Sequence, residues 1–278
     1  MRPVPGVRLT VVVDRPTAVY SGMVPGFVAG QYRRDELEID VRPLALRAGA
    51  RFIATPAVGL DPRERLIHLT GRPPLRYDTA AFDVGSTVAG LGISGVREHA
   101  LATRPIGRFV EHVNALIARA RERGRCRLVA VGAGAGGVEL AFAFRARLER
   151  EGVRDASVLL VESGPRVLPG YPAGTARRAE ANARARGIEI RLNSRVAEAR
   201  AAELVLTDGE RISFDALVWV AGAASLPLFH EAGVALDPRG FVRVRRTLQL
   251  LEHEDVFAVG DCASLEGAAD LAKAGVYA

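Results

Sequence analysis

Residues 127–139 read RLVAVGAGAGGVE, a short apolar run that breaks into glycines and then resumes with helical periodicity. The pattern predicts a strand, a tight turn and a helix. Gly132, Gly134 and Gly137 have the GxGxxG spacing: the first permits the turn, the second lets backbone approach a pyrophosphate, and the third lets helix pack against strand. The phosphates would lie on the N–H groups of the first helical turn, where unpaired donors and the positive dipole end coincide.

The sequence that follows completes the expected unit. Apolar residues recur on one helical face over 138–150, Gly152 ends that helix, and a second apolar run over 157–161 leads into Glu162. Glu162 stands 25 positions after Gly137, close to the spacing at which an acid accepts hydrogen bonds from ribose hydroxyls. Such a carboxylate repels a 2′-phosphate and so favours NADH over NADPH. The competing interpretation is a glycine-rich turn without a ligand in a chain rich in alanine and glycine.

Composition narrows the class of protein. The 278 residues allow two domains, and the net charge of +6 comes from arginine, because Lys273 is the only lysine. The arginines are scattered, which argues against nucleic acid as a partner. Cys126 and Cys262 form no CxxC or CxxxxC pair, so neither a redox dithiol nor a secreted disulfide framework is indicated, and the favoured compartment is the cytoplasm. No membrane-spanning segment is predicted, and the histidines lack metal-ligand spacing.

Three further stretches point toward ligand contact. Residues 7–14, VRLTVVVD, predict a strand that ends in Asp14. Residues 20–26, YSGMVPG, predict a loop that brings backbone close to a planar ligand, with a plain surface turn as the alternative. Residues 82–87, FDVGST, predict a strand end that runs into Gly85 and small hydroxyl residues, although a simple exit from a strand would look similar. Asp261 also follows a predicted strand, at the edge where open α/β sheets bind ligands.

Periodicity and turn residues predict the remaining elements. Helices are expected over 40–49 with Asp40 as cap, over 107–123, over 175–186 and after Asp261. Strands are expected over 51–54, 65–70 and 76–82 around a Gly-Arg-Pro-Pro turn, over 188–192, over 196–206 and 211–214 as a hairpin across Asp208-Gly209, and over 215–222, 241–250 and 255–259.

An ordered set of motifs carries a family resemblance. GAGAGGVELA with Glu162, then DALVWVAG, then VFAVGDCAS resemble the pyridine nucleotide-disulfide oxidoreductase superfamily. YSGMVPG, FDVGST and VFAVGDCA are more narrowly similar to its NADH dehydrogenase-like branch, including flavoproteins found fused to selenide, water dikinase. The resemblance implies an α/β fold of two Rossmann-like, three-layer dinucleotide-binding domains, with an NAD domain at 114–243 inserted in a FAD domain formed by 1–113 and 244–278.

The same resemblance implies roles for individual residues. Glu139 matches an acid beside the nicotinamide, Asp14 the acid that binds the adenosine ribose of FAD, and Asp261 the acid at the FAD ribitol and phosphate. Because the cofactors supply the chemistry of hydride transfer, no protein nucleophile or general base is expected. The full expected cofactor-binding set is Gly132, Gly134, Gly137, Glu162 and Gly222 for NAD, and Asp14, Met23, Pro25, Gly85, Ser86, Gly260 and Asp261 for FAD.

The implied activity is FAD-dependent transfer of hydride from NADH to flavin and on to a quinone or another small acceptor. The implied partners are that acceptor and an associated selenide, water dikinase domain, and the implied location is the cytoplasm, with peripheral membrane attachment in a longer form. No GxGxxG motif precedes the strand at 7–14, so the sequence resembles a family member truncated at both ends, and little bound flavin is expected. The alternative is a non-catalytic dinucleotide-binding or sensing module, or an inactive fragment.

Overall fold

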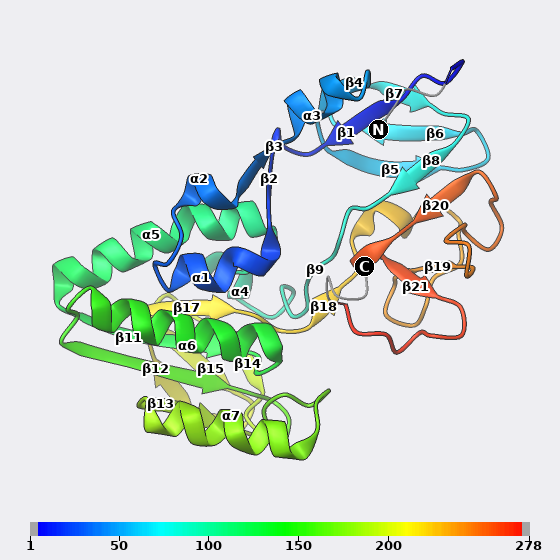
Figure 1. Ribbon diagram of the computed structural model, residues 1–278. Helices are drawn as coiled ribbons and strands as arrows, with labels where there is room; N and C mark the ends of the chain where they lie inside the picture. Colours follow the sequence, from blue (N-terminus) through cyan, green and yellow to red (C-terminus); the bar gives the residue numbers. More distant parts are fainter. Residues whose placement is uncertain (1–4, 274–278) are drawn as a thin grey trace. The chain divides into compact units, whose positions relative to one another are not determined.

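The computed structural model describes residues 5–273, and the chain forms two compact units (Figure 1). Unit 1 comprises Met1–Ala18, Glu38–Thr87 and Ala223–Ala278, and unit 2 comprises Val19–Leu37 and Val88–Gly222. The boundaries predicted from sequence fall elsewhere, after 113 and after 243. Residues 88–113 join unit 2 because strand β10 (Leu101–Ala102) pairs with its sheet.

Unit 2 is built on a five-stranded parallel sheet. Its strand order is β10, β17 (Ala216–Trp219), β11 (Arg125–Val131), β12 (Asp155–Val161) and β13 (Ile188–Arg191). Alternate residues of β11 face opposite layers: Leu128 and Ala130 join one apolar cluster, and Val129 and Val131 join another. The central strands are buried on both faces, as expected of a parallel sheet, which accounts for their continuous apolar sequences.

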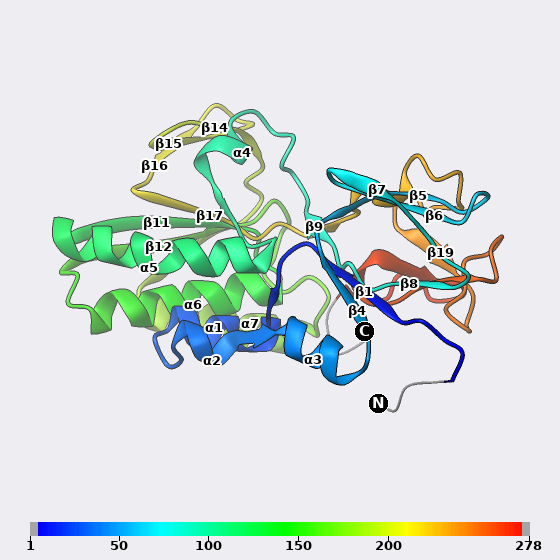
Figure 2. The ribbon, with the colours of Figure 1, turned by 90° about the horizontal axis from the view of Figure 1, so that it is seen from above.

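Helices and a small antiparallel sheet cover the two faces of this sheet (Figure 2). One apolar cluster joins the sheet to α5 (Ile106–Arg123), α6 (Ala135–Arg150) and α7 (Ala173–Ala185). The other joins it to β14 (Val196–Ala199), β15 (Glu203–Leu206) and β16 (Arg211–Ser213). The α/β class and the three-layer arrangement are therefore confirmed here. The expected single strand over 196–206 is instead two strands, β14 and β15, which form a second hairpin.

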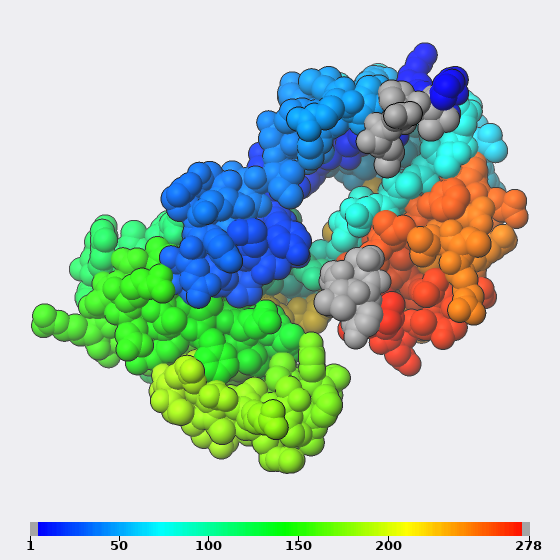
Figure 3. Space-filling model, viewed as in Figure 1, coloured from blue at the N-terminus to red at the C-terminus, as the bar shows by residue number. Residues whose placement is uncertain are grey.

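The stretch YSGMVPG is helical, so its prediction as a loop is wrong. A 3-10 turn, η1 (Ser21–Met23), leads into α1 (Val24–Val28), with Pro25 in the first helical turn. Val24, Phe27 and Val28 share one face and are buried in the helical cluster of unit 2. Their i, i+3, i+4 spacing and the proline were the signals of a helix start. The space-filling view shows residues 19–37 against the helical surface of unit 2 (Figure 3).

Unit 1 contains several short sheets. Two are parallel pairs, β1 (Thr10–Val13) with β4 (Arg51–Ala54) and β8 (Ala80–Phe82) with β20 (Val256–Ala258). A third parallel pair joins β19 (Val242–Val244) to β21 (Ala263–Leu265), and an antiparallel sheet contains β5 (Ala57–Asp61), β6 (Leu66–Leu69) and β7 (Arg72–Arg76). Helix α3 (Val41–Arg47) begins as predicted, with the Asp40 carboxylate accepting the Arg42 N–H at 3.0 Å.

Three predictions in unit 1 need correction. Residues 72–76, expected as a proline turn, form β7 at the edge of its sheet, the position in a sheet that tolerates proline. The strand expected over 241–250 is limited to β19, and a bridge between Val244 and Leu250 shows that the chain turns back on itself. After Asp261, which lies in the 3-10 turn η3 (Gly260–Cys262), β21 follows in place of a helix within the described residues, whereas 274–278 lie outside them.

The remaining elements are short. They are β2 (Thr17–Val19), α2 (Arg34–Leu37), β3 (Glu38–Asp40), β9 (Thr87–Val88), α4 (Val96–His99), β18 (Ala223–Ala224) and η2 (Pro227–Phe229).

Candidate functional site

The glycine turn between β11 and α6 has a separate steric reason for each glycine. Gly132 has φ +107°, and a Cβ there would lie 2.8 Å from the Val220 carbonyl oxygen. A Cβ on Gly137 would lie 1.8 Å from the Gly132 carbonyl oxygen, so helix and strand pack too closely for a side chain. A Cβ on Gly134 would meet no atom within 4 Å. The turn thus excludes side chains at two positions by its own packing, and at the third it leaves open space.

That open space faces the start of α6. Gly134 is the N-cap residue, and no side chain caps this end of the helix. The first-turn N–H groups of a helix have no intrahelical partners, and the helix dipole adds positive potential there. An anionic group with the shape of a pyrophosphate fits this position by charge and by room.

Glu162 lies directly after β12, at the same edge of the sheet. Its Oε2 accepts the Ala133 N–H of the glycine turn at 2.7 Å, and its Oε1 accepts the Gly164 N–H at 2.8 Å. Oε1 also accepts the Ser163 hydroxyl at 3.1 Å. The structure therefore brings the predicted ribose acid to the glycine turn, and it adds two backbone contacts that sequence spacing could not reveal.

Glu139 and Pro25 line one cavity of about 910 Å³ in unit 2. The wall includes Gly22 of η1, Gly26 of α1 and Phe142 of α6. Met23 precedes α1 and packs against the same helical cluster. The segment expected beside the flavin and the acid expected beside the nicotinamide are thus neighbours within unit 2. Gly222 ends the unit; its carbonyl accepts the Ala89 N–H at 2.6 Å, and a Cβ there would meet no atom within 4 Å.

In unit 1 the structure brings Ser86 to Asp261. The Ser86 hydroxyl donates to Asp261 Oδ2 at 3.3 Å, across 175 positions of sequence. Gly85 and Gly260, beside them in the chain, have φ of +68° and +66°, which only glycine adopts freely. Asp14 at the end of β1 is exposed, with its carboxylate 3.7 Å from the Arg15 guanidinium.

Lys273 is a neighbour of Asp261 that the sequence did not identify as a site residue. It lines a cavity of about 70 Å³ together with Gly260 and Asp261. Its ammonium lies 4.4 Å from the centre of the Phe241 ring and donates to the Ala263 carbonyl. Burial, assisted by the Arg239 charge, lowers the pKa of this lysine. No motif in the sequence around Lys273 indicated that this residue would lie near Asp261.

Formal charge divides unevenly between the units. Unit 2 contains 23 arginines against 17 acidic residues, whereas the 15 basic and 15 acidic residues of unit 1 balance. The whole net charge of +6 therefore belongs to unit 2. A net positive charge on the unit that contains the glycine turn favours encounter with a dianionic dinucleotide.

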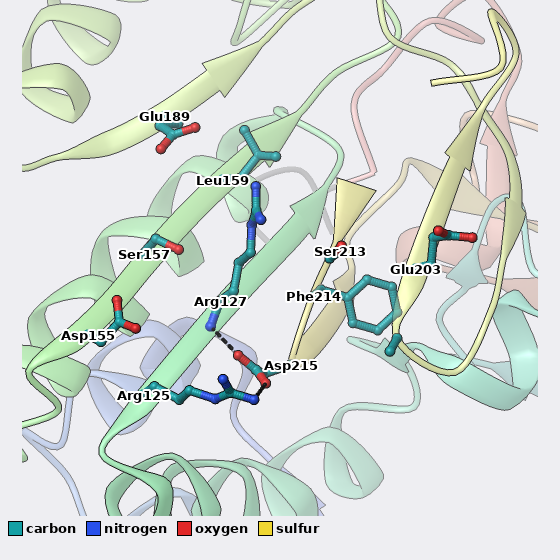
Figure 4. Close-up of a pocket in the computed structure, with 11 residues that line it drawn as sticks. Arg125, Arg127, Asp155, Ser157, Leu159, Glu189, Glu203, Ser213, Phe214 and Asp215 are labelled. Carbon is teal, nitrogen blue, oxygen red and sulfur yellow. Dashed lines mark hydrogen bonds and ion pairs between the residues drawn. The ribbon is translucent and has the colours of Figure 1, made fainter. Parts of the chain in front are cut away.

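A second cavity of unit 2, of about 720 Å³, lies at the opposite ends of the strands, where β11 and β12 begin (Figure 4). Asp215 joins its walls: its Oδ2 accepts the Arg127 N–H at 2.9 Å, and Oδ1 lies 4.0 Å from the Arg125 guanidinium. Glu203 is paired with Arg211 at 3.2 Å. None of the residues predicted to bind a cofactor lines this cavity.

Comparison with known proteins places the glycine turn in a family context. The sequence pattern of the pyridine nucleotide-disulphide oxidoreductases matches residues 3–277. The chain belongs to this family. A type II NADH:quinone oxidoreductase of Haemophilus influenzae is 32% identical over 109 residues, which cover 39% of this chain and 24% of that relative. A type II NADH:quinone oxidoreductase of Staphylococcus epidermidis is 24% identical over 253 residues, covering 85% of this chain and 62% of that protein.

Solved structures share the fold of the family. The structure of NDH2 from Plasmodium falciparum in complex with NADH superposes with a TM-score of 0.83 at 16% identity, covering 93% of this chain and 60% of that one. The water-forming NADH oxidase from Lactobacillus brevis gives a TM-score of 0.77 at 20% identity, covering 93% of this chain and 57% of that one. The chain thus spans about a quarter of the Haemophilus relative, and about six tenths of the NDH2 chain.

The two cysteines are free and buried. Burial raises the pKa of Cys126 to about 11 and also raises the pKa of Cys262, so both thiols stay protonated at neutral pH. Among residues 5–273 no cluster of three histidine, cysteine or acidic side chains could hold a metal ion. Within the same range, no helix combines the length and apolar character needed to cross a bilayer.

Proposed function

We propose that this protein takes part in FAD-dependent oxidation of NADH. NADH would bind at the glycine turn of unit 2, and hydride would pass from its nicotinamide to FAD and then to a quinone or another small acceptor. The observation that carries the proposal is the open, uncapped helix start at Gly134 with Glu162 beside it. Relatives that are NADH:quinone oxidoreductases support the choice of reductant and acceptor.

In unit 2 the residues would bind and orient the dinucleotide. The first-turn N–H groups of α6 would accept the pyrophosphate, and Glu162 would accept hydrogen bonds from the adenosine ribose hydroxyls. Gly222 would leave room for the cofactor at the end of the sheet. Glu139, exposed in the cavity that Pro25 also lines, would lie on the nicotinamide side.

Unit 1 would bind most of the flavin cofactor, which supplies the hydride-accepting ring when bound. Asp14 would bind the adenosine ribose, and Asp261, oriented by the Ser86 hydroxyl, would bind the ribitol and phosphate region. Gly85 and Gly260 would allow close backbone approach. Met23 and Pro25 would contribute from η1 and α1.

The finer expectations on partners and location belong to the same proposal. A quinone is the favoured acceptor, and the favoured location is the cytoplasm, with peripheral attachment to the membrane in a longer form. An associated selenide, water dikinase domain rests on motif resemblance alone, because the relatives compared above are not described as selenide, water dikinases.

The absorption spectrum of flavin separates this function from a non-catalytic dinucleotide-binding module. FAD would be added to the protein of the printed sequence and to a form with a strand-GxGxxG-helix segment fused ahead of it, and NADH would follow. We expect the fused form to retain FAD and to lose its visible absorbance when NADH is added. Binding of NADH without reduction of flavin in either form would favour the non-catalytic module instead.

A further inference from the structure

The carboxylate of Glu162 accepts a backbone hydrogen bond at each of its two oxygens. Oε2 accepts the Ala133 N–H at 2.7 Å and Oε1 accepts the Gly164 N–H at 2.8 Å. One carboxylate oxygen therefore binds the glycine turn, and the other binds the loop after β12. A single side chain links the two loops that must frame a dinucleotide.

The two peptide groups that flank Ala133 are each held by a hydrogen bond. The N–H of Ala133 donates to Glu162, and the carbonyl of Ala133 accepts the Leu168 N–H at 2.8 Å. Ala133 is fully buried and lies between Gly132, with φ +107°, and Gly134, the N-cap of α6. The orientation of these two peptide groups sets the path of the turn into the helix, and so the direction of the first-turn N–H groups.

We propose that Glu162 is a positioning residue for the glycine turn, in addition to its expected contact with the ribose. Its ionised carboxylate fixes the turn in the shape that accepts a pyrophosphate, so binding does not have to order the loop. The proposal rests on the proposed function in one respect only, namely that NADH binds at this turn. It predicts that loss of the carboxylate weakens binding of the pyrophosphate as well as of the ribose.

The chemistry of the side chain defines the informative variant. A glutamine at this position keeps the size of the side chain but offers one acceptor oxygen, and its NH₂ group cannot accept an N–H. Glu162→Gln therefore cannot satisfy both the Ala133 and the Gly164 donors. Glu189→Gln is the matched control, because Glu189 lies on β13 and lines the cavity at the opposite end of the strands.

The first measurement uses the protein without ligand. Backbone amide exchange followed by NMR would report on Ala133 and Gly164 in the wild type, in Glu162→Gln and in Glu189→Gln. We expect at least one of these two amides to exchange about tenfold faster in Glu162→Gln alone, with the thermal midpoint unchanged. Equal exchange of both amides in all three proteins would overturn the proposal.

The second measurement separates positioning from ribose contact. Affinity would be compared for NADH and for an NADH analogue whose adenosine ribose lacks its hydroxyls. A positioning role predicts that Glu162→Gln weakens the analogue by about tenfold, and NADH by more, because NADH also loses the ribose contact. A loss confined to NADH would overturn the proposal and leave ribose contact as the only role. If the wild type fails to bind NADH, the proposed function falls, while amide exchange still decides the role of Glu162.

Discussion

The two units differ in how completely secondary structure assembles their candidate sites. In unit 2 a five-stranded parallel sheet places the glycine turn, Glu162 and Gly222 at the ends of hydrogen-bonded neighbouring strands. In the described part of unit 1, β1 pairs only with β4, and the parallel pair of β8 with β20 stands as a separate sheet. Asp261 meets Ser86 there through loops that follow β20 and β8.

This difference indicates which of the two regions is held more completely by contacts within the protein. In unit 2 the backbone of the glycine turn is fixed by sheet register, by close helix packing at Gly137 and by the Glu162 carboxylate. Unit 2 also carries the whole positive net charge of the chain. We therefore expect recognition of NADH to belong to unit 2 and to depend on this backbone.

The largest expected effect comes from adding one methyl group to unit 2. Gly137→Ala would place a Cβ 1.8 Å from the Gly132 carbonyl oxygen, so helix and strand must separate, at a cost of about 1–3 kcal/mol or more. Gly136→Ala is the neighbouring control, since its Cβ would meet Val220 at an ordinary 3.7 Å. Urea unfolding followed by the fluorescence of Trp219, the only tryptophan, measures both.

Stability equal in the two alanine variants would show that the turn tolerates side chains, and it would break the steric account of the fingerprint. Alanine at 136 is expected to leave the protein as stable as the wild type, or more stable by up to about 1 kcal/mol, because alanine is the better helix former.

An intermediate effect concerns the choice between NADH and NADPH. The Glu162 carboxylate should accept hydrogen bonds from the two ribose hydroxyls and repel a 2′-phosphate, so the wild type should bind NADH more tightly than NADPH. Glu162→Ala should reduce this difference in affinity. A charge-assisted hydrogen bond of about 1.5–3 kcal/mol corresponds to roughly tenfold to a hundredfold in affinity. Competitive titration with both cofactors measures it. A wild type that prefers NADPH would mean that Glu162 is misassigned, and Arg166, four positions later, would become the candidate.

The smallest effect lies in unit 1, at Tyr77. Its hydroxyl is buried without a hydrogen-bond partner, and burial, with the Asp255 charge nearby, raises its pKa to about 12. An unfolded tyrosine loses its proton near pH 10. The stability that Tyr77 contributes is therefore complete below pH 10 and is lost as the pH rises toward about 12.

Tyr77→Phe should remove part of the loss of stability at alkaline pH. At pH 8 the free energy of unfolding should be unchanged or slightly higher, because the variant has no buried hydroxyl at this position without a hydrogen-bond partner. Tyr171→Phe is the control, since Tyr171 of unit 2 is exposed. Urea unfolding at pH 8 and pH 11 gives the comparison, and the same pH dependence in all three proteins would refute it.

The elements around the glycine turn of unit 2 could be predicted from sequence because each depends on residues that are close together in the chain. The apolar strand, the three glycines and the carboxylate after the next strand lie within 36 residues and define β11, α6, β12 and the turn. The α1 helix was missed because glycines and a proline suggested a loop, while burial of Phe27 against unit 2 stabilises the helix. The contacts of Ser86 with Asp261 and of Lys273 with the Phe241 ring depend on tertiary packing, so no local pattern encoded them.

Titration with NADH tests most directly the claim that unit 2 binds the dinucleotide through the open position at Gly134. Energy transfer from Trp219, at the end of β17 beside the turn, reports binding. Gly134→Val leaves backbone geometry permissible at φ −65° and fills the open space, whereas Gly174→Val, in the first turn of α7, is the control. The account predicts saturable binding to the wild type and the control, and affinity at least about tenfold weaker for Gly134→Val with unchanged stability. Equal affinity in all three proteins would contradict it.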